Sequence, residues 1–145
     1  MKRFALPVLA TALVIAGTAL AAEPQEMRQE AMKKAGGAAG TIAKMLKGEA
    51  PFDQATAKAA FATMAEVAGT FPDYFPAGSE TGFDTEASPK IWENMDDFKA
   101  HSAKLEQDAT AASMMDLVDA AALGGAMKTV AANCGGCHEL YRIKK

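Results

Sequence analysis

Cysteine, histidine and aromatic residues are all scarce in this chain of 145 residues. It contains two cysteines, two histidines and one tryptophan, and aromatic side chains make up 7% of the sequence. Cys134 and Cys137 are too close in sequence to cross-link distant segments, so a disulfide between them would add little to the fold. No pattern of Ser, His and Asp typical of a catalytic triad is present, and we therefore predict no enzymatic activity.

β-Branched residues are also sparse whereas alanine is abundant, and this balance favours helices over strands. No sustained alternation of apolar and polar residues indicates a strand. Apolar residues instead recur at helical spacing in four segments. The first segment runs from about 24 to 47 and the second from Asp53 to near Gly69. The third begins after an N-cap at Ser88, with Pro89 in its first turn. The fourth runs from about 115 to 143.

The N-terminal segment has the pattern of a secretory signal peptide. Two basic residues precede an uncharged apolar stretch over 4–20, and Ala19-Leu20-Ala21 forms a small-x-small cleavage site. A retained membrane anchor is the alternative, but a proline and a glycine interrupt the stretch. We predict a signal peptide over 1–21 and a mature domain over 22–145, with no stable membrane insertion after cleavage.

Two further regions are open to more than one interpretation. Three glycines fall within 35–40 of the first helical segment, where each costs about 1 kcal/mol relative to alanine. They indicate either the close approach of a flat or bulky group or a tight helix–helix contact. The connection over 71–88 is long for a compact domain, and we expect it to be a surface excursion packed by its own aromatic residues, Phe71, Tyr74, Phe75 and Phe83.

Cys134-Gly135-Gly136-Cys137-His138 matches the Cys-x-x-Cys-His pattern of covalent haem c attachment. Residues three and four apart share one face of a helix, so both thiols can bond the same porphyrin while His138 reaches its iron. Two other sites use closely spaced cysteines. A thioredoxin-like redox pair belongs near a βαβ unit, and no strand is readable before this motif. A structural zinc site needs four ligands, and the two cysteines and His138 leave too few. We therefore predict one covalent haem c, attached at Cys134 and Cys137 with His138 as an axial iron ligand.

The second axial position has several candidate ligands. Met32 is the preferred one, because it lies on the first helical segment beside the glycine-rich stretch that could admit a haem face. Met27, Met45 and His101 are the alternatives. Arg28 precedes Met32 by one helical turn, so we expect it to meet a haem propionate.

This arrangement resembles the class II c-type cytochromes, the cytochrome c-prime family. The resemblance is most specific over 134–142, where Arg142 follows the haem histidine by four residues, and in Arg28-Gln29-Glu30-Ala31-Met32. It implies an all-α fold, an antiparallel up-down-up-down four-helix bundle with covalently bound haem. It also implies that Arg142 lies near the histidine and haem edge, and that Met32 is the sixth ligand found in low-spin members of the family.

The first functional hypothesis is a one-electron carrier, because His/Met ligation raises the potential of a haem. The alternative is a high-spin, five-coordinate cytochrome c-prime that binds nitric oxide or carbon monoxide. A role in haem buffering or storage is a third hypothesis.

The charge balance bears on partners and location. Removal of residues 1–21 leaves 13 basic and 18 acidic residues, a net charge of −5. The sequence has no basic cluster interleaved with aromatic residues, so we do not expect nucleic acid as a partner. We expect redox partner proteins with a basic docking face. Export and the family resemblance together predict a periplasmic protein, which could also form a homodimer.

Overall fold

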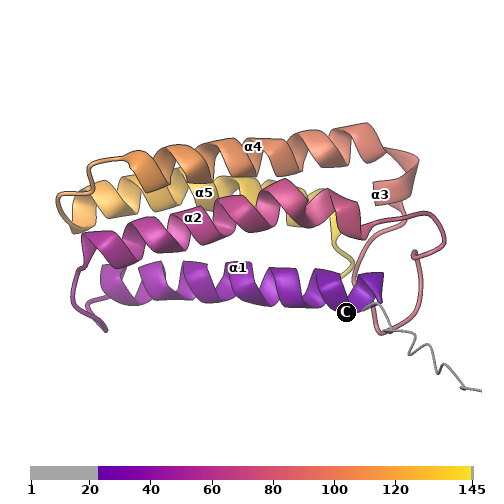
Figure 1. Ribbon diagram of the computed structural model, residues 1–145, viewed down its shortest axis with the longest axis horizontal. Coiled ribbons are helices and arrows are strands. Elements are labelled where there is room, and N and C mark those ends of the chain that lie inside the picture. The colour runs from indigo at the N-terminus through magenta and orange to yellow at the C-terminus, as the bar shows by residue number, and fades with distance from the viewer. Residues whose placement is uncertain (1–22, 145) are drawn as a thin grey trace, which may run out of the picture.

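The computed structural model describes residues 23–144, which form a bundle of four long helices (Figure 1). These helices are α1 (Pro24–Leu46), α2 (Gln54–Thr70), α4 (Met95–Met114) and α5 (Ala120–Tyr141). Short turns join α1 to α2 and α4 to α5, and a longer connection joins α2 to α4. Successive long helices run in opposite directions (Figure 1). The prediction of an all-α, up-down-up-down four-helix bundle is confirmed.

Two aspartates determine where α2 and α5 begin. The Asp53 carboxylate accepts a hydrogen bond from the Thr56 amide at 2.7 Å, and Asp119 accepts one from the Ala122 amide at 2.8 Å. Such caps satisfy amide groups that have no partner inside the helix. Because Asp119 caps α5, that helix begins at Ala120 rather than near residue 115, and Leu117 is buried in the turn before it.

The third predicted helix is divided in two. The short α3 (Lys90–Glu93) and the long α4 are separated by Asn94, whose φ of −141° and ψ of 57° are not helical. The Ser88 hydroxyl accepts a hydrogen bond from the Lys90 amide at 3.3 Å, but α3 begins at Lys90 with Pro89 as its N-cap, one residue later than predicted. The break turns α3 away from the α4 axis (Figure 1) and buries Ile91 in the same cluster as Phe98.

Two groups of buried apolar residues stabilise the bundle. We call the first the aliphatic core; it is made by the four long helices and the turn before α5, and its largest fully buried members are Ile42, Phe61, Leu117, Leu123 and Val130. We call the second the aromatic cluster; its buried members are Phe75, Ile91, Phe98 and Tyr141, with Phe71, Tyr74, Ala87, Trp92, Met95 and Cys137 packed against them.

The α2–α4 connection (residues 71–94) includes a 3-10 turn, η1 (Phe71–Tyr74), and α3. Its aromatic residues pack as predicted except Phe83, which is 52% exposed. The connection also pairs with the end of α5: the Ser88 amide donates to the Tyr141 carbonyl at 2.9 Å, and the Ile143 amide donates to the Glu86 carbonyl at 2.8 Å. This pairing explains why α5 ends at Tyr141 rather than at the predicted residue 143.

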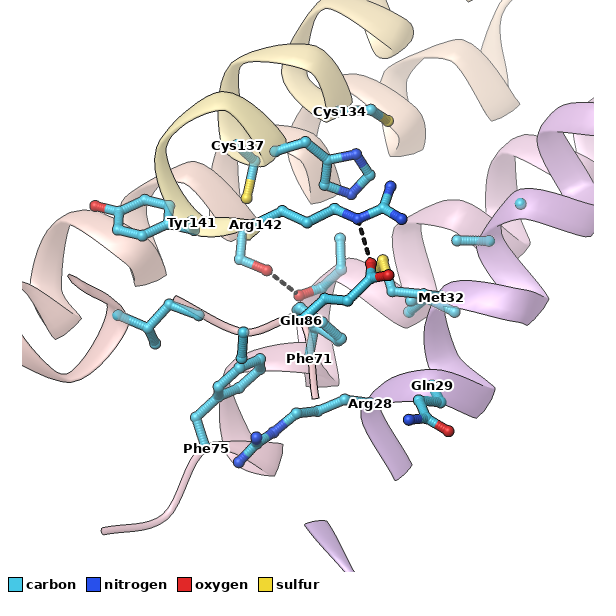
Figure 2. A pocket seen from close by; sticks show the side chains of 18 of the residues that line it. Arg28, Gln29, Met32, Phe71, Phe75, Glu86, Cys134, Cys137, Tyr141 and Arg142 are labelled. Atoms are coloured by element: carbon cyan, nitrogen blue, oxygen red, sulfur yellow. Dashed lines mark hydrogen bonds and ion pairs between the residues drawn. The ribbon is translucent and has the colours of Figure 1, made fainter. Parts of the chain in front are cut away.

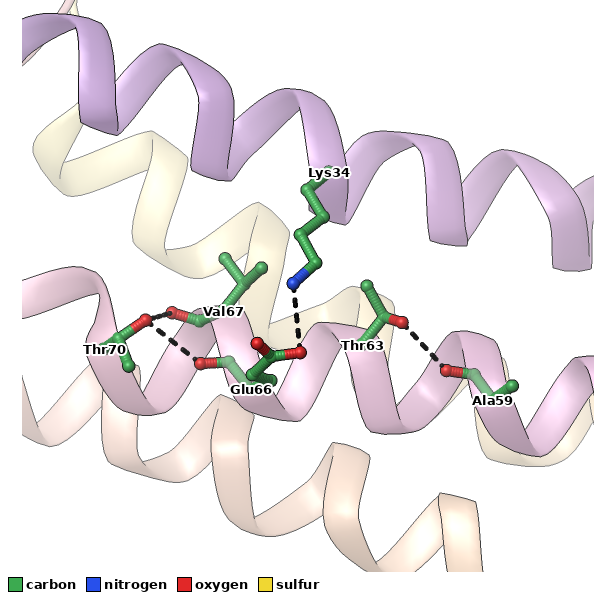
Figure 3. A network of polar contacts seen from close by, with 6 residues as sticks. All are labelled: Lys34, Ala59, Thr63, Glu66, Val67 and Thr70. Atoms are coloured by element: carbon green, nitrogen blue, oxygen red, sulfur yellow. Dashed lines mark hydrogen bonds and ion pairs between the residues drawn. The ribbon is translucent and has the colours of Figure 1, made fainter.

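The glycine-rich stretch of α1 makes no tight helix–helix contact within the described chain. A methyl group added at Gly36, Gly37 or Gly40 would meet no atom within 4 Å apart from its chain neighbours and the backbone of α1 itself. On the neighbouring surface, α1 and α2 lie side by side and are joined by Lys34, whose Nζ lies 3.0 Å from Glu66 Oε2 (Figure 3). Two interpretations remain, the close approach of a flat or bulky group and a contact with a second subunit.

Among residues 23–144, no helix combines the length and the apolar content needed to cross a membrane. The predicted signal peptide over 1–21 lies outside the described residues.

Candidate haem-binding site

A cavity of about 690 Å³ lies between α1 and α5, at the end of the bundle where the α2–α4 connection crosses it. Its volume is in the range of sites that enclose a cofactor. The aliphatic core contributes Met64, and the aromatic cluster contributes Phe71, Phe75, Phe98 and Tyr141. Both groups of buried residues therefore contribute to the cavity wall, most of which is apolar.

The α5 wall carries the attachment motif. Cys134, Cys137 and His138 all line the cavity, as their helical spacing predicts (Figure 2 labels both cysteines). Neither cysteine forms a disulfide, and burial raises the pKa of each thiol, which favours the protonated form before the haem is attached. The Cys134 Sγ lies 3.7 Å from the Val130 carbonyl one turn earlier.

Charged groups lie next to His138 at the cavity rim. Partial burial lowers the pKa of His138, the Arg142 guanidinium lowers it further, and the Glu86 carboxylate opposes this effect. A lowered pKa favours the neutral imidazole, which is the form that binds a metal. Arg142 Nε donates to Glu86 Oε2 at 2.6 Å, and both side chains line the cavity (Figure 2).

The α1 wall faces this motif and carries Met32. The Met32 side chain is partly buried and lines the cavity, with Gln29 one turn earlier and Gly36 one turn later (Figure 2 labels Met32 and Gln29). Gly36 is the member of the glycine-rich stretch that borders the cavity. The open space at this glycine is compatible with the approach of a flat ligand.

The alternative ligands do not line this cavity. Met27 is 37% exposed and borders a groove between α1 and α2, while Met45 is buried in the aliphatic core. His101 Nε2 lies 3.5 Å from Asp97 Oδ2, and its ring packs edge-on against Tyr141.

Arg28 lines the cavity but is engaged mainly by the protein. Its side chain is 5% exposed, with Nε donating to the Tyr74 carbonyl at 2.7 Å and Nη1 donating to the Ser79 carbonyl at 3.0 Å. Nη2 donates to the Ser79 hydroxyl, and the guanidinium lies over the Phe75 ring, 4.2 Å from its centroid. Burial lowers the pKa of Arg28, and Glu80 opposes this. Arg28 thus joins α1 to the α2–α4 connection. A haem propionate would bind only the guanidinium N–H groups that these three hydrogen bonds leave free.

Several residues of the cavity were not identified from the sequence. Met64 belongs to the apolar stripe of α2, and nothing in that periodicity distinguishes a cavity wall from a closed core. Glu86 and Gln29 are polar residues without a recognisable motif. The Gln29 amide nitrogen donates to the Phe83 carbonyl at 2.9 Å, which ties α1 to the connection at a residue with a φ of 49°.

The donor set fits a covalently attached haem. Two cysteine side chains and an imidazole lie along one wall, a thioether lies on the facing wall, and apolar rings line the space between them. Thiols can form thioether bonds to a porphyrin, and imidazole and thioether are both axial donors for haem iron. The residues present therefore match the group that the motif predicts.

The sequence model of the family described as Cytochrome C' matches residues 23–142. The chain belongs to the cytochrome c' family. Members of this family bind haem c covalently, and haem c is the cofactor here. Cytochrome c' proteins are carriers of electrons or haem proteins that bind gases, rather than conventional enzymes.

Individual relatives support this assignment within the cytochrome c' family. A cytochrome c-556 from Agrobacterium fabrum is 51% identical over 90% of this chain and 88% of its own. A solved cytochrome c' from Rhodopseudomonas palustris is 41% identical, covers 86% of this chain and 99% of its own, and has a TM-score of 0.81. The nitric oxide complex of a cytochrome c prime variant from Alcaligenes xylosoxidans is 29% identical, covers 85% and 98%, and has a TM-score of 0.69.

Proposed function

We propose that this cytochrome c' family member is a monohaem one-electron carrier whose iron is ligated by His138 and Met32, as in the low-spin subgroup. The observation that carries the proposal is that Met32 and His138 line one cavity from facing helices, next to both cysteines. The haem, when bound, supplies an iron that accepts and releases one electron. A pair of protein ligands that stays in place in both oxidation states reduces reorganisation during that exchange.

The residues of the chain have separate roles in this proposal. Cys134 and Cys137 hold the porphyrin against α5, and the neutral His138 imidazole binds the iron on that side. The Met32 thioether binds on the α1 side and raises the reduction potential. The apolar wall excludes water, while Arg142 adds positive charge near His138.

We further propose that residues 1–21 are a signal peptide and that residues 22–145 form the periplasmic haem domain. The family assignment and the export pattern of the sequence support this location. The net charge of −5 supports redox partners with a basic docking face, and family members are often dimers, which supports a homodimer.

Absorption spectra of the purified holoprotein test the ligand assignment. We expect a low-spin ferric spectrum with a sulfur-to-iron charge-transfer band, because the thioether occupies the sixth position. Met32→Ala should give a high-spin spectrum and abolish that band. Met27→Ala is the matched control and should leave both unchanged, since Met27 lies outside the cavity.

Met64→Ala distinguishes the second methionine of the cavity from Met32. We expect this variant to keep the low-spin spectrum. Conversion by Met64→Ala but not by Met32→Ala would transfer the ligand role to α2 and contradict our assignment.

A gas-binding role is the second candidate function. It is favoured by the structural similarity to a cytochrome c prime solved as its nitric oxide complex. In that case Met32 would pack beside the iron without binding it. A five-coordinate, high-spin ferric spectrum of the unmodified protein would support this role and exclude the His/Met carrier.

A further inference from the structure

Glu86 is held beside the haem site by the backbone as well as by its side chain. Its carbonyl accepts a hydrogen bond from the Ile143 amide at 2.8 Å, and the neighbouring Ala87 forms an isolated antiparallel bridge with Arg142. The Ser88 amide donates to the Tyr141 carbonyl. These contacts fix residues 86–88 against the end of α5, so the position of Glu86 follows from the fold.

The Glu86 side chain makes a directed contact with Arg142. Arg142 Nε lies 2.6 Å from Glu86 Oε2, and Figure 2 shows this pair at the cavity between α5 and α1. Arg142 follows His138 by one helical turn, and all three side chains line the same cavity. The carboxylate is therefore in a position to orient the guanidinium at the rim of the haem site.

The charges of the pair oppose each other at the imidazole. Arg142 acts on His138 as a cation, and Glu86 acts on it with the opposite sign. Oxidation of the haem adds one positive charge to the site, so an unpaired cation nearby disfavours the ferric form. A carboxylate that offsets the cation stabilises the ferric form and lowers the reduction potential.

We propose that Glu86 is a positioning residue that holds Arg142 beside His138, offsets its charge and thereby lowers the reduction potential of the haem. This inference rests on the part of the proposed function that assigns His138 to the iron. It does not require Met32 to be an iron ligand, because the argument uses only the charges of Glu86 and Arg142 at the cavity.

The test is a redox titration of the holoprotein with the variant Glu86→Gln. Glutamine keeps a hydrogen-bond acceptor for Arg142 but removes the negative charge. We expect the equilibrium constant for reduction to rise about three- to tenfold, where tenfold corresponds to about 59 mV for one electron. The effect should shrink at high salt, because the Glu86 and Arg142 side chains are 41% and 52% exposed.

Three further variants separate this role from a general loss of charge or structure. Glu49→Gln removes the same charge at the opposite end of the bundle and should shift the equilibrium far less. Glu86→Asp retains the charge and should restore most of the original potential. Arg142→Gln should lower the potential, since it removes the cation.

Each result bears on Glu86 separately from the proposed function. An equal shift of the reduction potential in Glu86→Gln and Glu49→Gln would overturn the inference. A changed ferric spectrum in Glu86→Gln would also overturn it, because Glu86 would then be needed to keep the iron ligands in place. Loss of the covalent haem or of histidine ligation would appear in the unmodified protein and would contradict the proposed function instead.

Discussion

The aliphatic core and the aromatic cluster stabilise different parts of the same bundle and are assembled differently. The aliphatic core joins the four long helices through small and branched side chains such as Ala57, Ile42 and Val130. The aromatic cluster joins α4 and α5 to the α2–α4 connection through ring contacts, including Phe98 with Phe75 at 4.7 Å between centroids. The first is a product of helix packing, whereas the second requires a folded connection.

The two groups also differ in their relation to the haem site. Cys137 packs against the aromatic cluster, and the buried rings of that cluster line the cavity. The fully buried members of the aliphatic core, such as Phe61 and Leu123, do not line it. We therefore expect the fully buried members of the aliphatic core to determine stability alone, and the aromatic cluster to determine both stability and the haem environment.

The largest expected effect comes from a matched pair of phenylalanine truncations. Phe61 is fully buried in the aliphatic core, and Phe98 is 1% exposed in the aromatic cluster. Each change to alanine should lower the free energy of unfolding by about 3–5 kcal/mol through lost burial and a new cavity. Denaturant unfolding of the holoprotein measures this loss.

The haem spectrum distinguishes the two truncations. Phe98→Ala should alter the absorption of the bound haem because Phe98 lines its cavity, and Phe61→Ala should not. Identical spectra for both variants would show that the distinction between the two groups has no functional meaning.

A smaller effect is expected where Arg28 joins α1 to the connection. Arg28→Met removes three hydrogen bonds, those to the Tyr74 carbonyl and to both oxygens of Ser79, and leaves the Ser79 carbonyl with only its contact to Gln25 Nε2 at 3.3 Å. We expect a loss of about 2–4 kcal/mol in unfolding free energy, measured by denaturant titration.

The matched control for Arg28 is Lys34→Met, which breaks the exposed ion pair with Glu66 shown in Figure 3. Exposed pairs contribute about 0–1 kcal/mol. A larger loss for Lys34→Met than for Arg28→Met would contradict the view that the buried guanidinium holds the connection in place.

The smallest expected effect concerns the hydroxyl of Tyr141. It donates to the Asp97 carboxylate, and this hydrogen bond raises the pKa of Tyr141 to about 12. The raised pKa belongs to the folded state, and an unfolded tyrosine titrates near its ordinary value of about 10. The hydrogen bond therefore contributes fully to the free energy of unfolding below about pH 10, and this contribution is lost as the pH rises toward 12. Tyr141→Phe should cost about 1 kcal/mol at neutral pH and remove this loss.

Unfolding measured between pH 8 and 12 tests the prediction for Tyr141. Asp97→Asn should return the titration toward that of an ordinary tyrosine, because a neutral amide does not favour the protonated hydroxyl as strongly. A stability profile unchanged in both variants would show that this hydrogen bond contributes nothing to folding.

Local patterns account for the parts of the structure that could be predicted. Helical spacing, an aspartate before α2 and the Ser88-Pro89 pair located the helices, because these interactions occur within one or two turns. The misplaced boundaries have tertiary causes. The break at Asn94 accompanies burial of Ile91 in the aromatic cluster, and the early end of α5 results from pairing with residues 86–88.

The two walls of the cavity show the same division. On α5, the positions of Cys134, Cys137 and His138 on one face follow from their spacing, so the sequence alone determined the attachment wall. On α1 and α2, Met27, Met45 and Met64 occupy apolar stripes and Met32 lies beside the glycine-rich stretch, and periodicity does not show which of them meets the haem. The packing of α1 and α2 against α5 placed Met32 and Met64 at the cavity and the other two elsewhere.

The sequence by itself determined the haem chemistry, the helical class and the family, because each is carried by short motifs whose own residues are close together along the chain. Only the tertiary structure decided which methionines face His138, that Arg28 joins α1 to the connection, and that Glu86 lies against Arg142. These contacts join residues that are far apart in sequence, and they form only when the whole bundle closes around the cavity.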